Sequence, residues 1–494
     1  SHNIAKFFTF RVNYCRMSFR LKTFLLSLLL INVFACSKKE SIRYSVAISI
    51  EPENSGIISP SNVNSLEEGE QIRLEARAND GYAFDRWEGT LNETTPTIDL
   101  IGSQDYTLRA HFRALPQLSQ NVVSYDYERI DSLPVFAIEN GGTSAYILDK
   151  SGNKRTTYTF DLRLGNDVTI EDNGNLLGIF KPQENPPFSF GGSGGVLREL
   201  TPESEVVWEY SIVSENELAH HDLTKLPNGN ILTLVWERIP LAQALSMGAS
   251  TTMDLFFEKI VEIDPSNNEI VWQWKSWEHL VQDQFEDRDN FGNLLTNLNK
   301  IDVNYNAIQE DGDWMHANAI TYDETRDLIF ISVNFYHEVW VIDHSTTTVE
   351  ASTSSGGNQN KGGDLVYRFG NPSTYNGIGE KFLDNVHHPN FSNDENSQML
   401  MFSNGGTTSQ SAVFEISIPA NLSLDPDADN GPQHLWNYTH PDLFFGKISG
   451  ASKLQNGNVL ITEGDYGLWE ITPAKLIAWK FEGENNFWRA YSTH

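Results

Sequence analysis

A β-hairpin motif that recurs along the chain constrains the fold more than any other feature of the sequence. In residues 219–234, AHHDLTKLPNGNILTL, two apolar runs are joined through Asn228-Gly229. Asn-Gly between two such runs is a strong short-range signal for a hairpin. Variants of the motif open, 55 to 95 residues apart, at Asn166, His221, His316, His388 and Ser449. β units that repeat at this spacing predict a β-propeller.

The repeat also predicts where histidines meet. The first strand of each propeller blade lines the central channel, so His221, His316 and His388 are expected at equivalent inner positions. The hairpins supply five inner strands, and residues 121–161 supply outer strands that lack an inner one. Residues 486–491 can provide that strand and close the ring, which leaves no long exposed sheet edge. We therefore predict an all-β chain, a six-bladed β-propeller preceded by a small N-terminal β domain.

Residues 1–36 have the composition of an export signal. The first 35 residues carry five lysines or arginines and no acid, and a short apolar run leads into Ala35-Cys36. A basic head followed by such a run predicts a signal peptide. Cys36 after Ala35 resembles the lipobox of bacterial lipoproteins, in which the cysteine is acylated. We expect an exported protein with a lipid anchor to the membrane, in the periplasm or at the outer membrane or cell surface.

Charge and cysteine content narrow the possible partners. The formal net charge is −31 and no basic stripe offsets it, which argues against a nucleic-acid partner. The sequence has only Cys15 and Cys36. Both lie at or before the expected processing site, so the mature fold is predicted to contain no disulfide.

A compact β unit is predicted for residues 44–113. Alternation at Ile72, Leu74 and Ala76 indicates a strand with one buried face. The runs GYAFDRWEG and RAHF in this segment resemble the divergent InlB B-repeat family of bacterial surface proteins. The resemblance implies a spacer or weak adhesion module.

From residue 121 the β pattern continues to residue 494, with two interruptions. Residues 240–247 and 277–312 have helical spacing and polar content. Insertions on one face of a propeller commonly cover the channel mouth. We therefore expect a helical insertion near 277–312 that acts as a lid or substrate wall.

Three imidazoles around one channel are compatible with several chemistries. Three neutral histidines can hold a catalytic zinc ion, but the chain has no HExxH motif and no short His-x-His pair. One imidazole can instead act as a nucleophile while its neighbours bind oxygens and move a proton. The residues alone leave these alternatives open.

A family resemblance favours group transfer. The runs AHHDLTKLPNGN, HANAI, GGDLVYRFGNP, HHPN with FSNG, and GNVLITEGDYGLWEIT are similar to those of the bacterial arylsulfate sulfotransferase family. The resemblance covers residues from about 160 to 494. It implies an enzyme that uses no phosphoadenosine cofactor and needs no metal. Such an enzyme moves a sulfuryl group from an aryl sulfate to a phenolic acceptor in two steps, through a sulfohistidine.

The resemblance also implies residue roles. It places the nucleophile on the pair His387-His388, and the spacing to residues 401–404 favours His388. His221 and His316, with Asn318, are expected to bind sulfuryl oxygens or shuttle the proton. The remaining candidates for substrate binding are Thr462 as a further donor, His387, His220, Asn334 and Arg368.

One position departs from the family pattern. The family has an arginine two residues after a serine on the strand that follows HxN, whereas here Ser332 is followed by Asn334. A neutral amide makes weaker hydrogen bonds to an anion than a guanidinium does. Arg368 is the nearest cation in the sequence, although the strand in which it lies favours a structural role. The position of His220 beside His221 likewise favours a structural role for His220.

Two other functions remain open from the sequence. Asn334 in place of arginine favours a non-catalytic propeller that binds an anionic glycan or a protein partner. The third hypothesis is a metal-dependent hydrolase or lyase, which loss of activity on chelation would distinguish.

Overall fold

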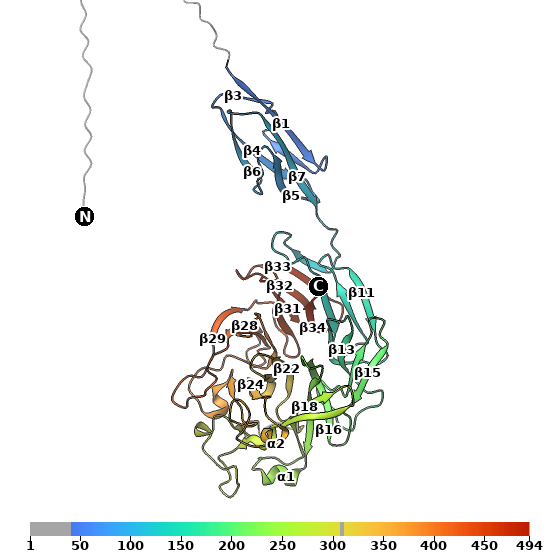
Figure 1. Ribbon diagram of the computed structural model, residues 1–494, viewed down its shortest axis with the longest axis vertical. Helices are drawn as coiled ribbons and strands as arrows, with labels where there is room; N and C mark the ends of the chain where they lie inside the picture. The colour runs from blue at the N-terminus through green and yellow to red at the C-terminus, as the bar shows by residue number, and fades with distance from the viewer. Residues whose placement is uncertain (1–40, 307–310, 494) are drawn as a thin grey trace, which may run out of the picture. The chain divides into compact units, whose positions relative to one another are not determined.

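The computed structural model describes residues 41–306 and 311–493, and the predicted signal peptide with Cys36 lies outside these residues. The chain divides between Leu115 and Pro116 into two compact units (Figure 1). In the part of the chain that the structure describes, no helix is long and apolar enough to cross a membrane.

The N-terminal unit is a β fold of two sheets. One sheet has the strand order β3-β1-β7-β5 and the other β2-β4-β6, with β1 and β7 parallel. Trp87, Leu74, Leu100 and Leu108 form the buried centre between them. The strands are β1 (Arg43–Glu51), β2 (Gly56–Ser59), β3 (Ser65–Glu67), β4 (Gln71–Ala78), β5 (Tyr82–Gly89), β6 (Thr97–Ile101) and β7 (Tyr106–Ala114).

The C-terminal part of the chain consists of six four-stranded antiparallel repeats. We call these repeats units 1 to 6 and give the strands of each from the innermost outward. Unit 1 has β34 (Phe487–Ser492), β9 (Val135–Glu139), β10 (Ser144–Leu148) and β11 (Lys154–Thr159). Unit 2 has β12 (Leu164–Ile170), β13 (Leu176–Phe180), β14 (Val196–Leu200) and β15 (Val206–Ser211). Unit 3 has β16 (Glu217–Lys225), β17 (Ile231–Ile239), β18 (Leu255–Asp264) and β19 (Glu269–Lys275).

The second half of the ring follows the same plan. Unit 4 has β22 (Ala317–Asp323), β23 (Leu328–Val333), β24 (Glu338–Asp343) and β25 (Tyr367–Phe369). Unit 5 has β26 (Val386–Phe391), β27 (Gln398–Ser403), β28 (Ala412–Ser417) and β29 (Gln433–Tyr438). Unit 6 has β30 (Gly450–Lys453), β31 (Val459–Glu463), β32 (Gly467–Ile471) and β33 (Ile477–Glu482), and β8 (Val122–Tyr125) extends its outer edge.

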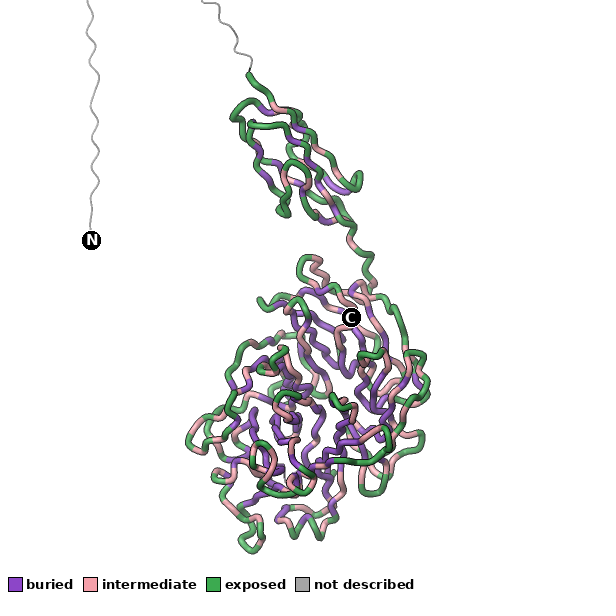
Figure 2. The backbone as a smooth tube through the Cα atoms, in the orientation of Figure 1, coloured by how far each residue is buried: buried purple, intermediate pink, exposed green. Residues whose placement is uncertain are grey.

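The innermost strands of units 1 to 6 form a closed ring, which makes the C-terminal part of the chain a β-propeller. The strands β12, β16, β22, β26, β30 and β34 contact one another in cyclic order. Closure comes from the two ends of the chain, because β34 pairs antiparallel with β9. This is the pairing predicted for residues 486–491. Buried backbone concentrates in the inner strands and exposed backbone in the outer turns (Figure 2).

The interruptions between the strands contain little helix. Residues 240–247 form the short helix α1 (Leu241–Ser246), as their spacing predicts. The described part of 277–312 differs from the helical expectation, because it contains only short elements: η1 (Ser276–His279), β20 (Leu280–Val281), η2 (Leu294–Thr296) and β21 (Ile301–Asp302). The other short helices are η3 (Asn334–Tyr336), α2 (Thr348–Ala351) and η4 (Pro372–Tyr375).

Candidate active site

A cavity of about 520 Å³ is lined by residues from all six units of the propeller. Three imidazoles line it, those of His221, His316 and His387. Of the described residues of 277–312, Asp311 alone lines it. Residues 181–195, between β13 and β14, contribute Lys181, Phe190, Gly191 and Gly192 to its lining.

The five motif positions aligned from the sequence share one backbone feature, a positive φ. Such a φ is uncommon for residues other than glycine and often marks a functional site. In four of the five units the register of the inner strand shifts at or next to this position. A β-bulge of this kind redirects the side chains around it. The φ angles are 138° at Asn166, 57° at His221, 55° at His316, 52° at His388 and 90° at Ser449.

The bulge in unit 5 determines which of two adjacent histidines faces the cavity. His387 lines the cavity, whereas His388 packs against unit 6 and Tyr491, with ring centroids 5.8 Å apart. A Cβ atom on Gly450 would lie 2.6 Å from Nδ1 of His388, which has no hydrogen-bond partner. The structure therefore places His387, and not the expected His388, on the cavity. Sequence spacing identifies the strand, but the bulge sets the direction of each ring.

The hydrogen bonds of Asn404 assign the tautomer of His387. The Asn404 Nδ2 atom donates to the carbonyls of Phe445 and Ile448, both at 2.7 Å, so its Oδ1 atom accepts. That Oδ1 atom lies 2.6 Å from Nδ1 of His387, which must carry the proton. Burial lowers the pKa of His387 to about 3. The ring is therefore neutral near pH 7, and its Nε2 atom holds a lone pair.

His316, in contrast to the neutral His387, is stabilised in its protonated, cationic form. Its Nδ1 atom contacts Oδ2 of Asp313 at 2.5 Å, and 16% of its side chain is exposed. Burial opposes protonation, but the charge and hydrogen bond of Asp313 outweigh it and raise the pKa of His316. The imidazolium form is therefore stabilised at the cavity, where it can bind an anionic oxygen.

His221 is connected to a buried acid through a second imidazole. Its ring centroid lies 4.8 Å from that of His316. The Nδ1 atoms of His221 and His220 are 2.8 Å apart, and Nε2 of His220 is 3.0 Å from Oε2 of Glu258. His220 and Glu258 are completely buried. His220 therefore lies behind His221 and does not itself line the cavity, where it was expected to contact substrate.

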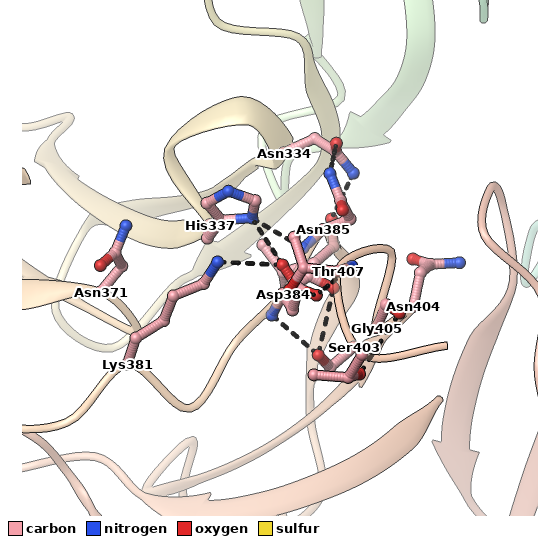
Figure 3. A network of polar contacts seen from close by, with 12 residues as sticks. Asn334, His337, Asn371, Lys381, Asp384, Asn385, Ser403, Asn404, Gly405 and Thr407 are labelled. Carbon is pink, nitrogen blue, oxygen red and sulfur yellow. Dashed lines mark hydrogen bonds and ion pairs between the residues drawn. The ribbon is translucent and has the colours of Figure 1, made fainter. Parts of the chain in front are cut away.

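Asn334 lines the cavity beside His387, as expected of the position that replaces an arginine. The Nδ2 atom of Asn385 donates to Oδ1 of Asn334 at 2.8 Å (Figure 3). The Nδ2 atom of Asn334 lies 3.5 Å from Nδ1 of His387. Asp384, next in the chain, accepts from Lys381 and from the backbone and hydroxyl of Thr407 (Figure 3). This network holds the turn that leads into β26.

Positive charge reaches the cavity from loops that the sequence motifs do not include. Arg163, Lys181 and Lys447 line the cavity from units 2 and 6. The Nε atom of Arg163 donates to the carbonyl of Gly141 at 2.9 Å. Burial, and then the charge of Arg163, lower the pKa of Lys181. These three cations, which we call the cationic rim, line the same cavity as Asn334, which stands at the position of the family arginine.

The closing strand β34 contributes a buried polar centre that sequence reasoning missed. The ring of Trp488 lies 6.0 Å from His221 and 6.3 Å from His387, between centroids. Arg489 donates through Nη1 to Asp222 at 2.9 Å and through Nη2 to the carbonyl of Asn318 at 3.1 Å. This cation ties β34 to units 3 and 4.

Three other predicted site residues do not line the cavity. Asn318 links β22 to β26, because its Nδ2 atom donates to the carbonyl of Val386 at 2.9 Å. Thr462 is buried on β31. Arg368 is completely buried in an ion pair with Glu338, as its strand context suggested. None of the three lines the cavity that His221, His316 and His387 share.

The described side chains at this site are not arranged as the ligands of a metal ion. Within residues 41–306 and 311–493, no group of three or more His, Cys, Asp or Glu side chains is arranged to hold a metal ion. The three cavity imidazoles differ in their partners, an amide for His387, a carboxylate for His316 and an imidazole for His221. Different partners give the rings different protonation states, which suits acid, base and nucleophile roles.

The fold and the site together define a β-propeller with a histidine-lined central cavity. Residues 131–485 match the arylsulfotransferase (ASST) family, and the chain belongs to that family. Membership assigns it a sulfotransferase function in general. Residues 46–116 match the divergent InlB B-repeat domain, which confirms the resemblance seen in the sequence.

Other comparisons are more distant. No curated protein matches the chain. The Dos1 propeller is similar at 10% identity with a TM-score of 0.32, over 74% of this chain and 75% of that one. Apo AztD from Citrobacter koseri is similar at 7% identity with a TM-score of 0.34, over 73% of this chain and 98% of that one. Similarity at this level supports no functional argument.

Proposed function

We propose that this protein transfers a sulfuryl group from an aryl sulfate to a phenolic acceptor through a sulfohistidine at His387. One observation carries the proposal: the hydrogen bond from Nδ1 of His387 to Asn404 leaves the Nε2 lone pair on a ring that lines the cavity. His221 and His316 line the same cavity. A neutral, oriented imidazole is an effective nucleophile toward an electrophilic sulfur centre.

In the first half-reaction, Nε2 of His387 attacks the sulfur atom. The N–S bond forms as the bond from sulfur to the aryl oxygen breaks, and that oxygen leaves with the bonding electron pair. A proton from Nε2 of His221 neutralises it, so a phenol is released. The sulfurylated His387 ring keeps the proton on Nδ1, which stays hydrogen-bonded to Asn404. The ring is therefore cationic and carries the anionic sulfuryl group.

In the second half-reaction, a phenol takes the place of the first product. Its oxygen attacks the sulfur atom while its proton passes to His221. The N–S bond breaks, and its electron pair returns to Nε2 of His387. Neither step requires a nucleotide cofactor, because the histidine carries the sulfuryl group between the two phenols.

Charge stabilisation in this proposal does not depend on the arginine that Asn334 replaces. The imidazolium of His316 can bind the sulfuryl oxygens, and the cationic rim adds positive charge around the cavity. Donors placed where negative charge develops are usually the largest contribution to catalysis of this type. The loss of the arginine therefore does not by itself favour a non-catalytic binding protein.

The test is release of 4-nitrophenol from 4-nitrophenyl sulfate, with and without added phenol. Transfer predicts that release beyond one equivalent per protein depends on phenol and yields phenyl sulfate. Continuous release without phenol would indicate hydrolysis, and no release would indicate a binding protein. His387→Asn should abolish turnover, whereas His388→Asn, one residue along the strand, should retain it.

The position of the intermediate provides an independent check. Incubation with donor alone, followed by an alkaline quench and peptide fragmentation, should place the sulfuryl group on residue 387. A sulfuryl group on residue 388 would overturn the assignment even if both variants were inactive.

We also propose that Cys36 anchors the exported protein to a membrane. The proposal rests on the lipobox-like Ala35-Cys36 and on the basic, apolar segment before it. Labelling of the expressed precursor with a palmitate analogue should be lost in Cys36→Ser. Unchanged labelling in that variant would contradict the proposal.

A further inference from the structure

A polar chain behind His221 has no role in the two half-reactions described so far. His220 and Glu258 are both completely buried, yet each is held in a defined hydrogen-bonding position. The ring of His220 stacks on Trp236, with centroids 3.8 Å apart and planes 8° from parallel. The Oε1 atom of Glu258 accepts from the backbone N–H of Ala317 at 2.7 Å, which leaves Oε2 for His220.

The contact between the two imidazoles restricts their protonation. A hydrogen bond between the Nδ1 atoms of His220 and His221 requires that one of them carry a proton and the other accept it. If Nδ1 of His220 carries the proton, neutral His221 is protonated at Nε2. If Nδ1 of His221 carries it, Nε2 of His221 is bare. The direction of one hydrogen bond therefore sets whether His221 is an acid or a base toward the cavity.

The carboxyl group of Glu258 completes this switch. In the acid state, protonated Glu258 donates to Nε2 of His220, which donates through Nδ1 to His221. In the base state, all three protons have moved one place toward the cavity. Glu258 is then a carboxylate that accepts from His220 and from the backbone N–H of Ala317.

We propose that Glu258, His220 and His221 form a proton relay that delivers one proton to the leaving phenol and recovers it from the acceptor phenol. This inference rests on the proposed sulfotransferase function. His221 gives its Nε2 proton to the leaving oxygen, His220 passes its Nδ1 proton to His221, and Glu258 passes its proton to Nε2 of His220. The acceptor phenol reverses each transfer, so the protein has the same number of protons after each turnover.

The surroundings of the chain favour the acid state at rest. Burial raises the pKa of Glu258 well above its ordinary value, although the Ala317 N–H opposes this. Burial likewise lowers the pKa values of His220 and His221. The charged or titratable groups that face the chain are Asp313, His316, His387 and Arg489.

The relay stores its proton on a carboxyl group instead of on an imidazolium. The cation at His316 and the cation at Arg489 would both oppose a charge on His221. A proton held on the carboxyl group of Glu258 instead adds no positive charge near the sulfuryl site. Glu258 and His220 do not line the cavity, so they are positioning residues that act through His221.

Glu258→Gln tests the relay with little change in shape. The glutamine can accept from Ala317 and donate to Nε2 of His220, so both contacts survive, but it cannot supply a proton. Only a poor leaving group needs that proton. In the first half-reaction without acceptor, the loss should be about 10²-fold or more for phenyl sulfate but less than about threefold for 4-nitrophenyl sulfate, on the usual scale of general acid catalysis of about 10²–10⁴-fold.

Glu262→Gln, on the same strand β18 and away from the cavity, is the matched control. It should show no dependence on the leaving group. An equal loss for both donors in Glu258→Gln would mean that Glu258 has a structural role only, and would overturn the relay.

Nitrogen NMR of histidine-labelled protein tests the same chain without turnover. One proton should be shared between Nδ1 of His220 and Nδ1 of His221, and Glu258→Gln should hold His221 in the Nε2–H form. A doubly protonated His221 near pH 7, or no shared proton, would overturn the relay. Absence of phenol release by the wild type from any aryl sulfate would instead refute the sulfotransferase proposal, and the NMR result would still decide the relay.

Discussion

The Oδ1 atom of Asn404 lies 2.6 Å from Nδ1 of His387 and selects the nitrogen that is free to react. The two residues belong to one hairpin, with His387 on β26 and Asn404 directly after β27. The orientation of the amide is itself determined by two backbone carbonyls in the loop before unit 6. The reactivity of His387 therefore depends on contacts between neighbouring units of the propeller.

Asn404→Ala should impair the enzyme more than it destabilises the fold. Loss of an orienting partner typically costs about 10–100-fold in activity, and we expect kcat to fall by this factor. The carbonyls of Phe445 and Ile448 lose their donor, which should cost about 1–3 kcal/mol of unfolding free energy. Transfer kinetics and urea unfolding measure the two effects. Asn421→Ala, at an exposed turn, should change neither, and full activity in Asn404→Ala would contradict the tautomer assignment.

Asp313→Asn should shift the pH dependence of transfer to lower pH. Asp313 raises the pKa of His316 against the effect of burial, so the imidazolium persists above the ordinary histidine pKa of about 6.5. Activity that needs this cation is present below the pKa of the folded protein and is lost as pH rises through it. Removing the carboxylate lowers that pKa, and the alkaline limb of the kcat/KM profile should follow.

The free energy of unfolding should fall with rising pH over the same range in which activity is lost. A raised pKa contributes stability that is complete below the unfolded-state pKa of about 6.5 and is lost as pH rises through the folded-state value. Urea unfolding across this range should show a smaller loss in Asp313→Asn than in the wild type. Asp311→Asn, which removes a charge but no hydrogen bond to the ring, should shift both profiles less. An unshifted alkaline limb in Asp313→Asn would exclude His316 as the titrating group.

The ring architecture was predictable because it depends on local chemistry. Asn-Gly turns such as Asn228-Gly229 mark the hairpins, and their spacing reveals the repeat. Closure of the ring followed from counting, since residues 121–161 lacked an inner strand that residues 487–492 supply. The convergence of His221 and His316 on one cavity follows from their common place in the repeat.

The choice between His387 and His388 was not predictable from spacing. A backbone φ of 52° at His388 and the shift in register next to it turn that ring toward unit 6. The cationic rim was missed because Arg163, Lys181 and Lys447 lie on loops without a motif. Asp313, three residues before His316, was a usable signal, because a carboxylate often orients an imidazole through a hydrogen bond to one ring nitrogen.

Neutralising the cationic rim should weaken donor binding more than it slows the chemical step. A hydrogen bond to a charged group contributes about 1.5–3 kcal/mol, so Lys181→Gln should raise KM for an aryl sulfate by about 10-fold or more. Lys447→Gln, at an exposed position, should have a smaller effect that disappears at high salt. Initial rates across ionic strength measure both. Lys475→Gln, on a distant exposed turn, is the control, and an unchanged KM in both rim variants would show that the rim does not bind the donor.

Gly192→Ala should disable His221 by crowding. A Cβ atom at residue 192 would lie 1.9 Å from Nε2 of His221, and the φ of 84° adds strain for any L side chain. Gly229→Ala is the control that separates crowding from backbone strain. Gly229 has a φ of 91°, and nothing lies within 4 Å of its Cβ position. Both variants should lose about 1 kcal/mol of unfolding free energy from the backbone conformation. Only Gly192→Ala should lose transfer activity, since only its methyl group displaces the imidazole. Equal activity in the two variants would show that the position of His221 does not limit the reaction.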